Sequence, residues 1–281
     1  MGWKRIFGRR IEAIRPKNHD GRHARLHRAF HAYSLPRGKL LIVLLLPLIF
    51  NLLLLAAIEV MVPFWFAVMK FCFTATDFPG DMVAIPFNLV IATVWLPSVD
   101  LYAGAPTQTQ WWISAIGGVL VWLATKLMPP ARLMPLIYVI RAMVLIHGTS
   151  LAFFALAPGA FPRDLSSYLF TSMAMGLLMM FLVPWVLAFV YYVFDFRLYQ
   201  KVALTALVLL YFALALPIQY ALHAALLWRL SLLFLPLFYL AFGYLLDVTV
   251  FIAFYAWAMT WDGPGLNHPP RSIAYPGDGD R

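Results

Sequence analysis

Long apolar stretches separated by short polar segments dominate the chain from Leu40 onwards. A helix needs about 20 mostly apolar residues to cross a bilayer. Blocks of this kind lie at 40–69, 111–128, 133–156, 168–194 and 202–261. The last block is too long for one crossing, so we expect a tight turn near 223–229 to divide it into spans at 202–222 and 230–261. The pattern predicts an all-α integral membrane protein with a bundle of about six transmembrane helices.

A shorter apolar stretch at 82–97 raises the question of a seventh crossing. Cytoplasmic loops carry an excess of Lys and Arg. With six spans and a cytoplasmic N-terminus, two basic pairs fall in inner connections, and a seventh crossing would move both outside. The pairs are Lys126 with Arg132 and Arg197 with Lys201. We therefore expect 72–110 to be an external loop whose segment 82–97 is interfacial or partly re-entrant and packs against the helices.

The composition is that of a membrane protein, and the distribution of charge excludes one class of binding partner. The 281 residues are 63% apolar and 12% charged, against about 45–50% and about 25% in a soluble domain. Residues 1–39 carry eleven Lys or Arg and two acids, so they account for the whole net charge of +9 and the other 242 residues sum to zero. This distribution excludes a uniformly basic nucleic-acid-binding protein. The single cysteine, Cys72, excludes an intrachain disulfide and a thiolate metal cluster.

The basic residues of 1–39 lie on two short amphipathic helical patterns. Such helices lie on a membrane surface and are attracted to anionic lipids of the inner leaflet. The residues expected to anchor this cytoplasmic segment are Arg5, Arg9, Arg22, Arg25 and Arg28. Histidines recur every fourth position from His19 to His31, but no acid or cysteine completes a ligand shell, so we expect no metal site. The Pro- and Gly-rich tail 262–281 is expected to be cytoplasmic and disordered.

Ionisable residues inside the spans are candidates for function, because charge at membrane depth is costly. Arg141 and Asp247 are predicted at similar depths, within reach of each other. They either line a path for a polar or anionic group, together with Tyr138 and Tyr244, or form a buried ion pair that sets the helix register. We expect His147 to be a hydrogen-bonded interhelical residue rather than a haem or metal ligand, because haem bridging needs a second buried histidine and His223 is expected near the outer turn.

No motif identifies a reaction. The phosphate loop, the dinucleotide-binding glycine pattern, the nucleophile elbow and the zinc-protease pattern are all absent, and we expect no cofactor. Our leading hypothesis is the membrane subunit of a transport or envelope-assembly system that handles a lipidic or amphipathic substrate. It would lie in the cytoplasmic membrane, with both termini cytoplasmic and with soluble or membrane protein partners. The alternatives are an intramembrane enzyme for a lipid-linked or phosphate-bearing substrate, with Arg141 binding phosphate and His147 or Asp247 as acid or base, and a non-catalytic scaffold subunit.

Overall fold

A computed structural model describes residues 37–261 except 90–91, 102–103, 162–163 and 194–195. Within these residues, five helices are long and apolar enough to cross a membrane. They are Leu41–Ala75, Leu133–Leu156, Leu165–Tyr191, Leu198–Leu230 and Leu232–Ala258. The chain is therefore an α-helical membrane protein. The predicted anchoring arginines, from Arg5 to Arg28, and the predicted tail lie outside the described residues.

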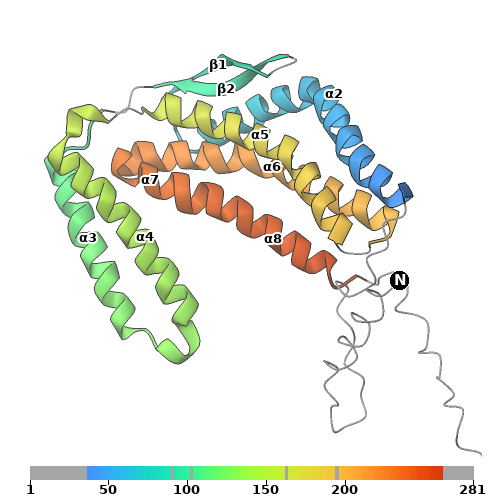
Figure 1. Cartoon of the computed structure of the whole chain (residues 1–281). Helices are drawn as coiled ribbons and strands as arrows, with labels where there is room; N and C mark the ends of the chain where they lie inside the picture. The colour runs from blue at the N-terminus through green and yellow to red at the C-terminus, as the bar shows by residue number, and fades with distance from the viewer. Residues whose placement is uncertain (1–36, 90–91, 102–103, 162–163, 194–195, 262–281) are drawn as a thin grey trace, which may run out of the picture.

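Three long helices form the body of the molecule: α2 (Arg37–Ala75), α5 (Leu165–Val193) and α6 (Leu198–Leu230) (Figure 1). The buried indole of Trp65 on α2 donates a hydrogen bond to the Ala213 carbonyl on α6, 2.8 Å away. At Gly176 on α5, an added Cβ would lie 2.8 Å from Leu216 Cδ1 on α6. Small residues at helix crossings permit such close approach in membranes, so Gly176 determines how tightly α5 and α6 pack.

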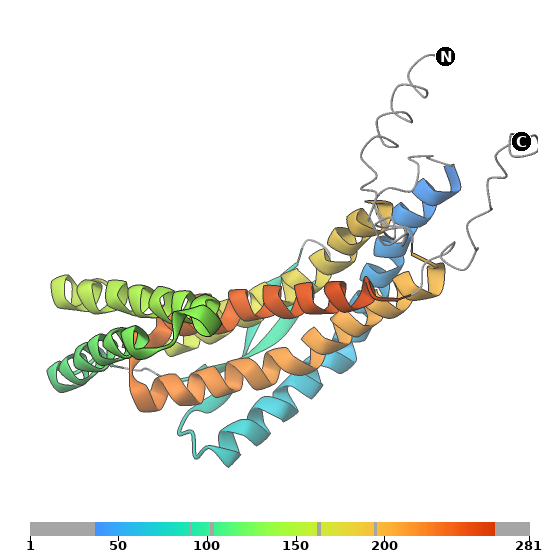
Figure 2. The same cartoon turned by 90° about the horizontal axis from the view of Figure 1, so that it is seen from below.

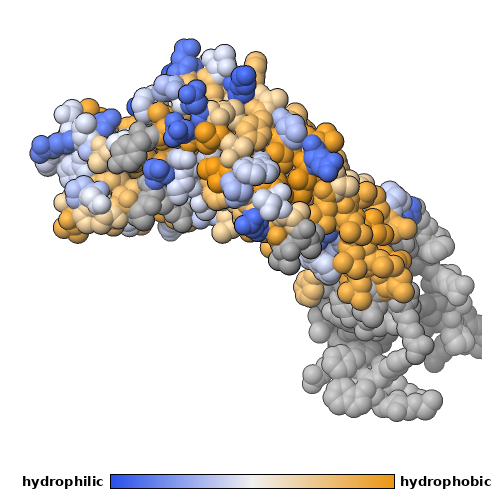
Figure 3. Space-filling model, turned by 90° about the horizontal axis from the view of Figure 1, so that it is seen from above, coloured by the Kyte–Doolittle hydropathy of each residue, from blue (hydrophilic) through white to orange (hydrophobic). Residues whose placement is uncertain are grey.

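The surface of this body is apolar where α2 begins. Seen from above, a continuous hydrophobic area covers that end, whereas hydrophilic residues gather toward the other (Figure 3). Leu41, Leu44 and Leu52 on α2 are more than half exposed. An apolar surface of this extent would not be stable in water, so it is the surface that the bilayer covers.

Helices α3 (Gln108–Leu127) and α4 (Pro130–Leu156) form a hairpin that projects away from the body (Figures 1 and 2). The 20-residue α3 coincides with the predicted span 111–128, but it is not among the five helices that meet the length and apolarity needed for crossing. The hairpin is joined to the body through contacts of α4 with η3 (Leu232–Phe234) and α7 (Leu235–Leu237), the first turns of the last span.

The last span continues from α7 into a π-helix, η4 (Phe238–Leu245), and then into α8 (Leu246–Ala258). The turn before it corrects one prediction. Instead of breaking near 223–229, α6 continues to Leu230, and the chain reverses at Ser231, whose φ of 144° lies in a region that normally requires glycine. The polar residues that suggested a turn are helical. His223, for example, is buried on α6 rather than placed at a helix end.

The segment 82–97 forms an antiparallel hairpin of β1 (Asp81–Asn88) and β2 (Thr93–Asp100), with register Asp81 opposite Asp100 and Asn88 opposite Thr93. It therefore adds two strands to the predicted all-α fold. Strand β2 packs on α5 and α2 and buries Val94, Leu96 and Val99, so the segment does pack against the helices, as expected. Alternation of apolar and outward-facing residues is the signal of a half-buried strand.

The hairpin follows a defined end of α2. Asp77 adopts a left-handed conformation (φ 51°), and the Phe78 amide reaches back to the Phe73 carbonyl, as in a Schellman cap. Arg229 Nη2, near the end of α6, donates a hydrogen bond to the Thr76 carbonyl at 2.7 Å. The ends of α2 and α6 are thereby joined on the side of the molecule that carries the β-hairpin.

Candidate functional site

Polar side chains gather between α5, α6 and the last span. We call this set the buried polar cluster. It contains Tyr168 and Ser172 on α5, Gln219, Tyr220 and His223 on α6, Tyr239 and Tyr244 on η4, and Asp247 on α8. Most members are buried inside membrane-spanning helices. Polar groups at that depth normally serve a function or join helices.

The centre of the cluster is a hydrogen bond between α5 and α6. Tyr168 Oη and His223 Nδ1 are 2.9 Å apart, and the two residues are 0% and 5% exposed. The ring of Tyr220 meets the His223 ring edge-on, with centroids 5.5 Å apart. A Cβ at Gly243 on η4 would lie 3.8 Å from the Tyr220 hydroxyl oxygen, so the glycine brings the last span close to this group.

The π-helix arranges the side of the cluster formed by the last span. Its i to i+5 hydrogen bonding turns Tyr239 and Tyr244, five residues apart, toward each other, with hydroxyl oxygens 3.2 Å apart. Gln219 on α6 donates a hydrogen bond to the Phe242 carbonyl at 2.7 Å. In a regular α-helical projection, Tyr244 shares one face of the helix with Asp247, and Tyr239 lies at the edge of that face. The π-helix instead pairs the two tyrosines.

Asp247 is the acidic member of the cluster. Its side chain is 5% exposed, its Oδ1 has no hydrogen-bond partner, and the Gln219 side chain lies beside the carboxyl group. Among the described residues no Lys, Arg or His forms an ion pair with it. A buried carboxyl group without a cation is unusual, because burying an unpaired charge costs several kcal/mol.

The structure does not bring Arg141 to Asp247, which corrects the predicted proximity. Arg141 Nε donates to Thr125 Oγ1 at 3.0 Å, and its guanidinium lies over the Trp122 ring at 5.4 Å. Both partners are on α3, within the projecting hairpin. The last span packs against α4 mainly at η3 and α7, and beyond them the two helices diverge (Figure 1). Tyr138, 63% exposed on α4, lies outside the cluster as well.

His147 lies on α4 in a separate place. Its Nε2 is 2.7 Å from Ser114 Oγ on α3, and its ring stacks on Phe234 of η3 with centroids 4.5 Å apart. His147 is thus a hydrogen-bonded interhelical residue, as predicted, and joins the hairpin to the last span. Within the described part of the chain, no three His, Cys, Asp or Glu residues form a group that could hold a metal ion.

Sequence reasoning missed the α5 and α6 members of the cluster. It assigned His223 to the neighbourhood of a turn, and Tyr168 to the end of a span. A usable signal was present, because Gln219, Tyr220 and His223 are spaced so that they share one face of a helix. Polar residues confined to one face of a membrane helix indicate a buried interface rather than a helix end.

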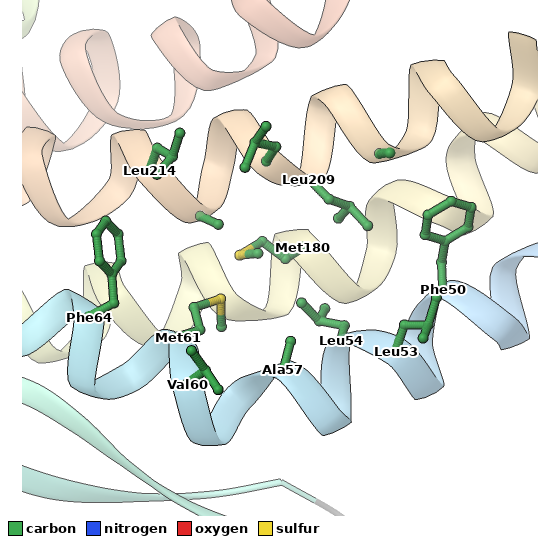
Figure 4. Close-up of a pocket in the computed structure, with 13 residues that line it drawn as sticks. Phe50, Leu53, Leu54, Ala57, Val60, Met61, Phe64, Met180, Leu209 and Leu214 are labelled. Atoms are coloured by element: carbon green, nitrogen blue, oxygen red, sulfur yellow. The ribbon is translucent and has the colours of Figure 1, made fainter.

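A second feature is an apolar groove on the other side of α5 and α6, between them and α2 (Figure 4). Its volume is about 480 Å³. Leu54, Met61 and Met180 form a buried floor, whereas Val60 and Leu210 on the walls are exposed. The lining residues are Phe50, Leu53, Leu54, Ala57, Val60, Met61, Phe64, Met180, Ala206, Leu209, Leu210, Ala213 and Leu214. The groove is therefore open to whatever surrounds the helices.

Fold and site together define an α-helical membrane protein with a lipid-facing apolar groove and a buried polar cluster. No protein-family model matches the chain, and neither a curated protein nor a solved structure shows significant similarity to it.

Proposed function

We propose that the protein is the membrane subunit of a transport or envelope-assembly system and handles a lipidic or amphipathic molecule. The apolar groove carries this proposal. Every residue that lines it is aliphatic, aromatic or a thioether, so an acyl chain can enter without desolvating a polar group. Because lipid tails are as apolar as the groove, retention depends on van der Waals fit rather than on the hydrophobic effect.

The other two hypotheses have less support. A scaffold explains the intramembrane charges by a structural ion pair, but Arg141 is bonded to Thr125 within its own hairpin and Asp247 has no cation among the described residues. An enzyme that binds phosphate through Arg141 needs an acid or base beside that arginine. Asp247 lies on the diverging last span, and His147 lies six residues, about 9 Å, beyond Arg141 along α4 and is hydrogen-bonded to Ser114, so neither is placed beside that arginine.

We further propose six crossings in the cytoplasmic membrane, with α3 as the sixth and both termini cytoplasmic. The charge distribution supports this orientation, and the basic segment before α2 would bind anionic lipids of the inner leaflet and soluble or membrane protein partners. Nucleic acid is not a proposed partner. Single cysteines at Ala84 and Ala274 in a Cys72→Ser background test the topology. An impermeant maleimide should label only the first from outside, and labelling of Ala84 only from the cytoplasm would contradict it.

Photo-crosslinking tests the groove directly. The full-length protein is reconstituted in nanodiscs with a phospholipid that carries a diazirine on one acyl chain, and crosslinked peptides are mapped by mass spectrometry. We expect adducts on α2 and α6 at residues that line the groove. Ala57→Trp fills the groove and should remove these adducts. Ala56→Trp, one residue away and outside the lining, is the matched control and should leave them.

Complementation connects the groove to function. In cells that lack the gene, the wild-type protein and Ala56→Trp should restore the lipid composition of the envelope, whereas Ala57→Trp should not. Crosslinks that spread evenly over all lipid-facing residues, or that are equal in the two variants, would refute the proposal, because the groove would then be ordinary lipid-facing surface.

A further inference from the structure

The carboxyl group of Asp247 has the neutral Gln219 side chain beside it, which offers a negative charge only weak stabilisation. The residue is buried in the last span, Oδ1 lacks a hydrogen-bond partner, and no cation among the described residues faces it. A carboxylate isolated in this way at membrane depth is strongly disfavoured. The protonated, neutral carboxylic acid avoids that cost. Binding a proton needs no counter-ion and no space for a larger ligand.

The titratable groups around Asp247 are neutral and able to exchange protons. Gln219 lies beside the carboxyl group, and Tyr168, Tyr211 and Tyr220 of the neighbouring helices lie near it. The titratable groups that face this region are Tyr168 on α5, Tyr211, Tyr220 and His223 on α6, and Tyr239 and Tyr244 on η4. A phenol hydroxyl both donates and accepts, and a neutral imidazole has one nitrogen of each kind.

Two hydrogen-bonded pairs are already present in this set. Tyr168 is bonded to His223, and the hydroxyl groups of the half-buried Tyr239 and Tyr244 are in contact. Each pair joins a donor to an acceptor, so a proton can pass along it while another leaves from the far side, with no net change in charge. These two pairs are the components of a proton relay, and they lie in the same cluster as a single acid, Asp247.

We propose that Asp247 is a proton-binding site, protonated at rest, and that release and recapture of this proton drive the movement of the cargo. The first part depends only on the buried polar cluster. The coupling to cargo rests on the proposed function. During a cycle the acid gives its proton to the relay and becomes a transient carboxylate, and a proton from the other side of the membrane restores it.

Infrared spectroscopy of the full-length protein in nanodiscs tests the resting state. At neutral pH exposed carboxyl groups are ionised, so the carbonyl stretch of a neutral carboxylic acid reports buried ones. We expect this band in the wild type, its loss in Asp247→Asn, and its retention in Asp81→Asn, which removes an exposed acid from β1, outside the membrane-spanning helices. A wild type without the band, or a band that persists in Asp247→Asn, would overturn the site. The wild-type spectrum decides even if the variant does not fold.

Proteoliposomes with an imposed pH gradient test the coupling. The gradient should accelerate transbilayer movement of a fluorescent phospholipid by the wild type, and this acceleration should be lost in Asp247→Asn while diazirine crosslinking in the groove remains. An equal response of the two proteins would overturn the coupling. Crosslinking without the acid band refutes the proton site and leaves the proposed function intact. The acid band without groove crosslinking supports the proton site and refutes the proposed function.

Discussion

Replacing Tyr168 by phenylalanine should reveal how much the hydrogen bond at the centre of the cluster stabilises the fold. The change removes the hydroxyl group that lies 2.9 Å from His223 Nδ1 and leaves that nitrogen in a residue that is only 5% exposed. An unsatisfied buried polar group costs about 1–3 kcal/mol. In membranes, measured interhelical hydrogen bonds average about 0.6 and reach about 1.7 kcal/mol, because the unfolded chain also finds partners. We therefore expect Tyr168→Phe to lower the free energy of unfolding by about 1 kcal/mol.

The same reasoning predicts how a double mutant behaves. His223→Leu leaves the buried Tyr168 hydroxyl group without its hydrogen-bond partner and should lower the free energy of unfolding by about 1–2 kcal/mol. With both partners apolar no group is left unsatisfied, so Tyr168→Phe/His223→Leu should lose about 1 kcal/mol less than the sum of the single losses.

Unfolding by SDS in mixed micelles, followed by tryptophan fluorescence, measures the three values. Tyr138→Phe is the matched control: it deletes the same hydroxyl group at a position that is 63% exposed and should change stability by no more than about 0.5 kcal/mol. Strictly additive losses, or a control that loses as much as Tyr168→Phe, would refute the assignment of the bond as the link between α5 and α6.

Three further predictions concern packing, the turn and the charges. Gly176→Ala places a Cβ 2.8 Å from Leu216 Cδ1 and should destabilise by about 1–3 kcal/mol in the same unfolding assay; an unchanged value would contradict the close crossing of α5 and α6. Ser231→Gly and Ser231→Ala both remove the hydroxyl group, but only glycine adopts a φ of 144° freely, so the glycine variant should be more stable by about 1–3 kcal/mol. Equal stabilities would show that the turn is not strained. The charge swap Arg141→Asp/Asp247→Arg should not recover the stability lost by either single change, because the two side chains do not meet. Recovery of that stability in the double variant would show that the two residues form the ion pair that the sequence predicted.

The helices themselves were predictable, because crossing a bilayer requires a length and an apolarity that do not depend on neighbouring helices. The blocks 133–156 and 168–194 begin and end within three residues of α4 and α5. The division of the last block was wrong, because polar residues such as His223 were interpreted as marking a turn when they face a buried interface.

The candidate site was less predictable because it depends on which helices lie together. Depth along a span follows from the sequence, and it placed Arg141 and Asp247 at similar levels. Their separation results from the divergence of the α3–α4 hairpin from α8, a tertiary feature that periodicity does not encode. The faces assigned to Tyr239 and Tyr244 also changed, because projection at 100° per residue assumes a regular α-helix, and η4 is not one.

The π-helix makes the last span tolerant of one particular change in length. Deleting Leu240 would allow Phe238–Leu245 to relax into ordinary α-helix, which satisfies every backbone group. Because a π-helix holds about one residue more than an α-helix over the same length, the residues beyond the deletion would keep nearly their present faces, and Asp247 would stay at the cluster. The same deletion within the regular α8 would turn everything beyond it by about 100° and shift it by about 1.5 Å. Homologues should therefore accept the loss of one residue between Phe238 and Leu245 more readily than between Leu246 and Ala258.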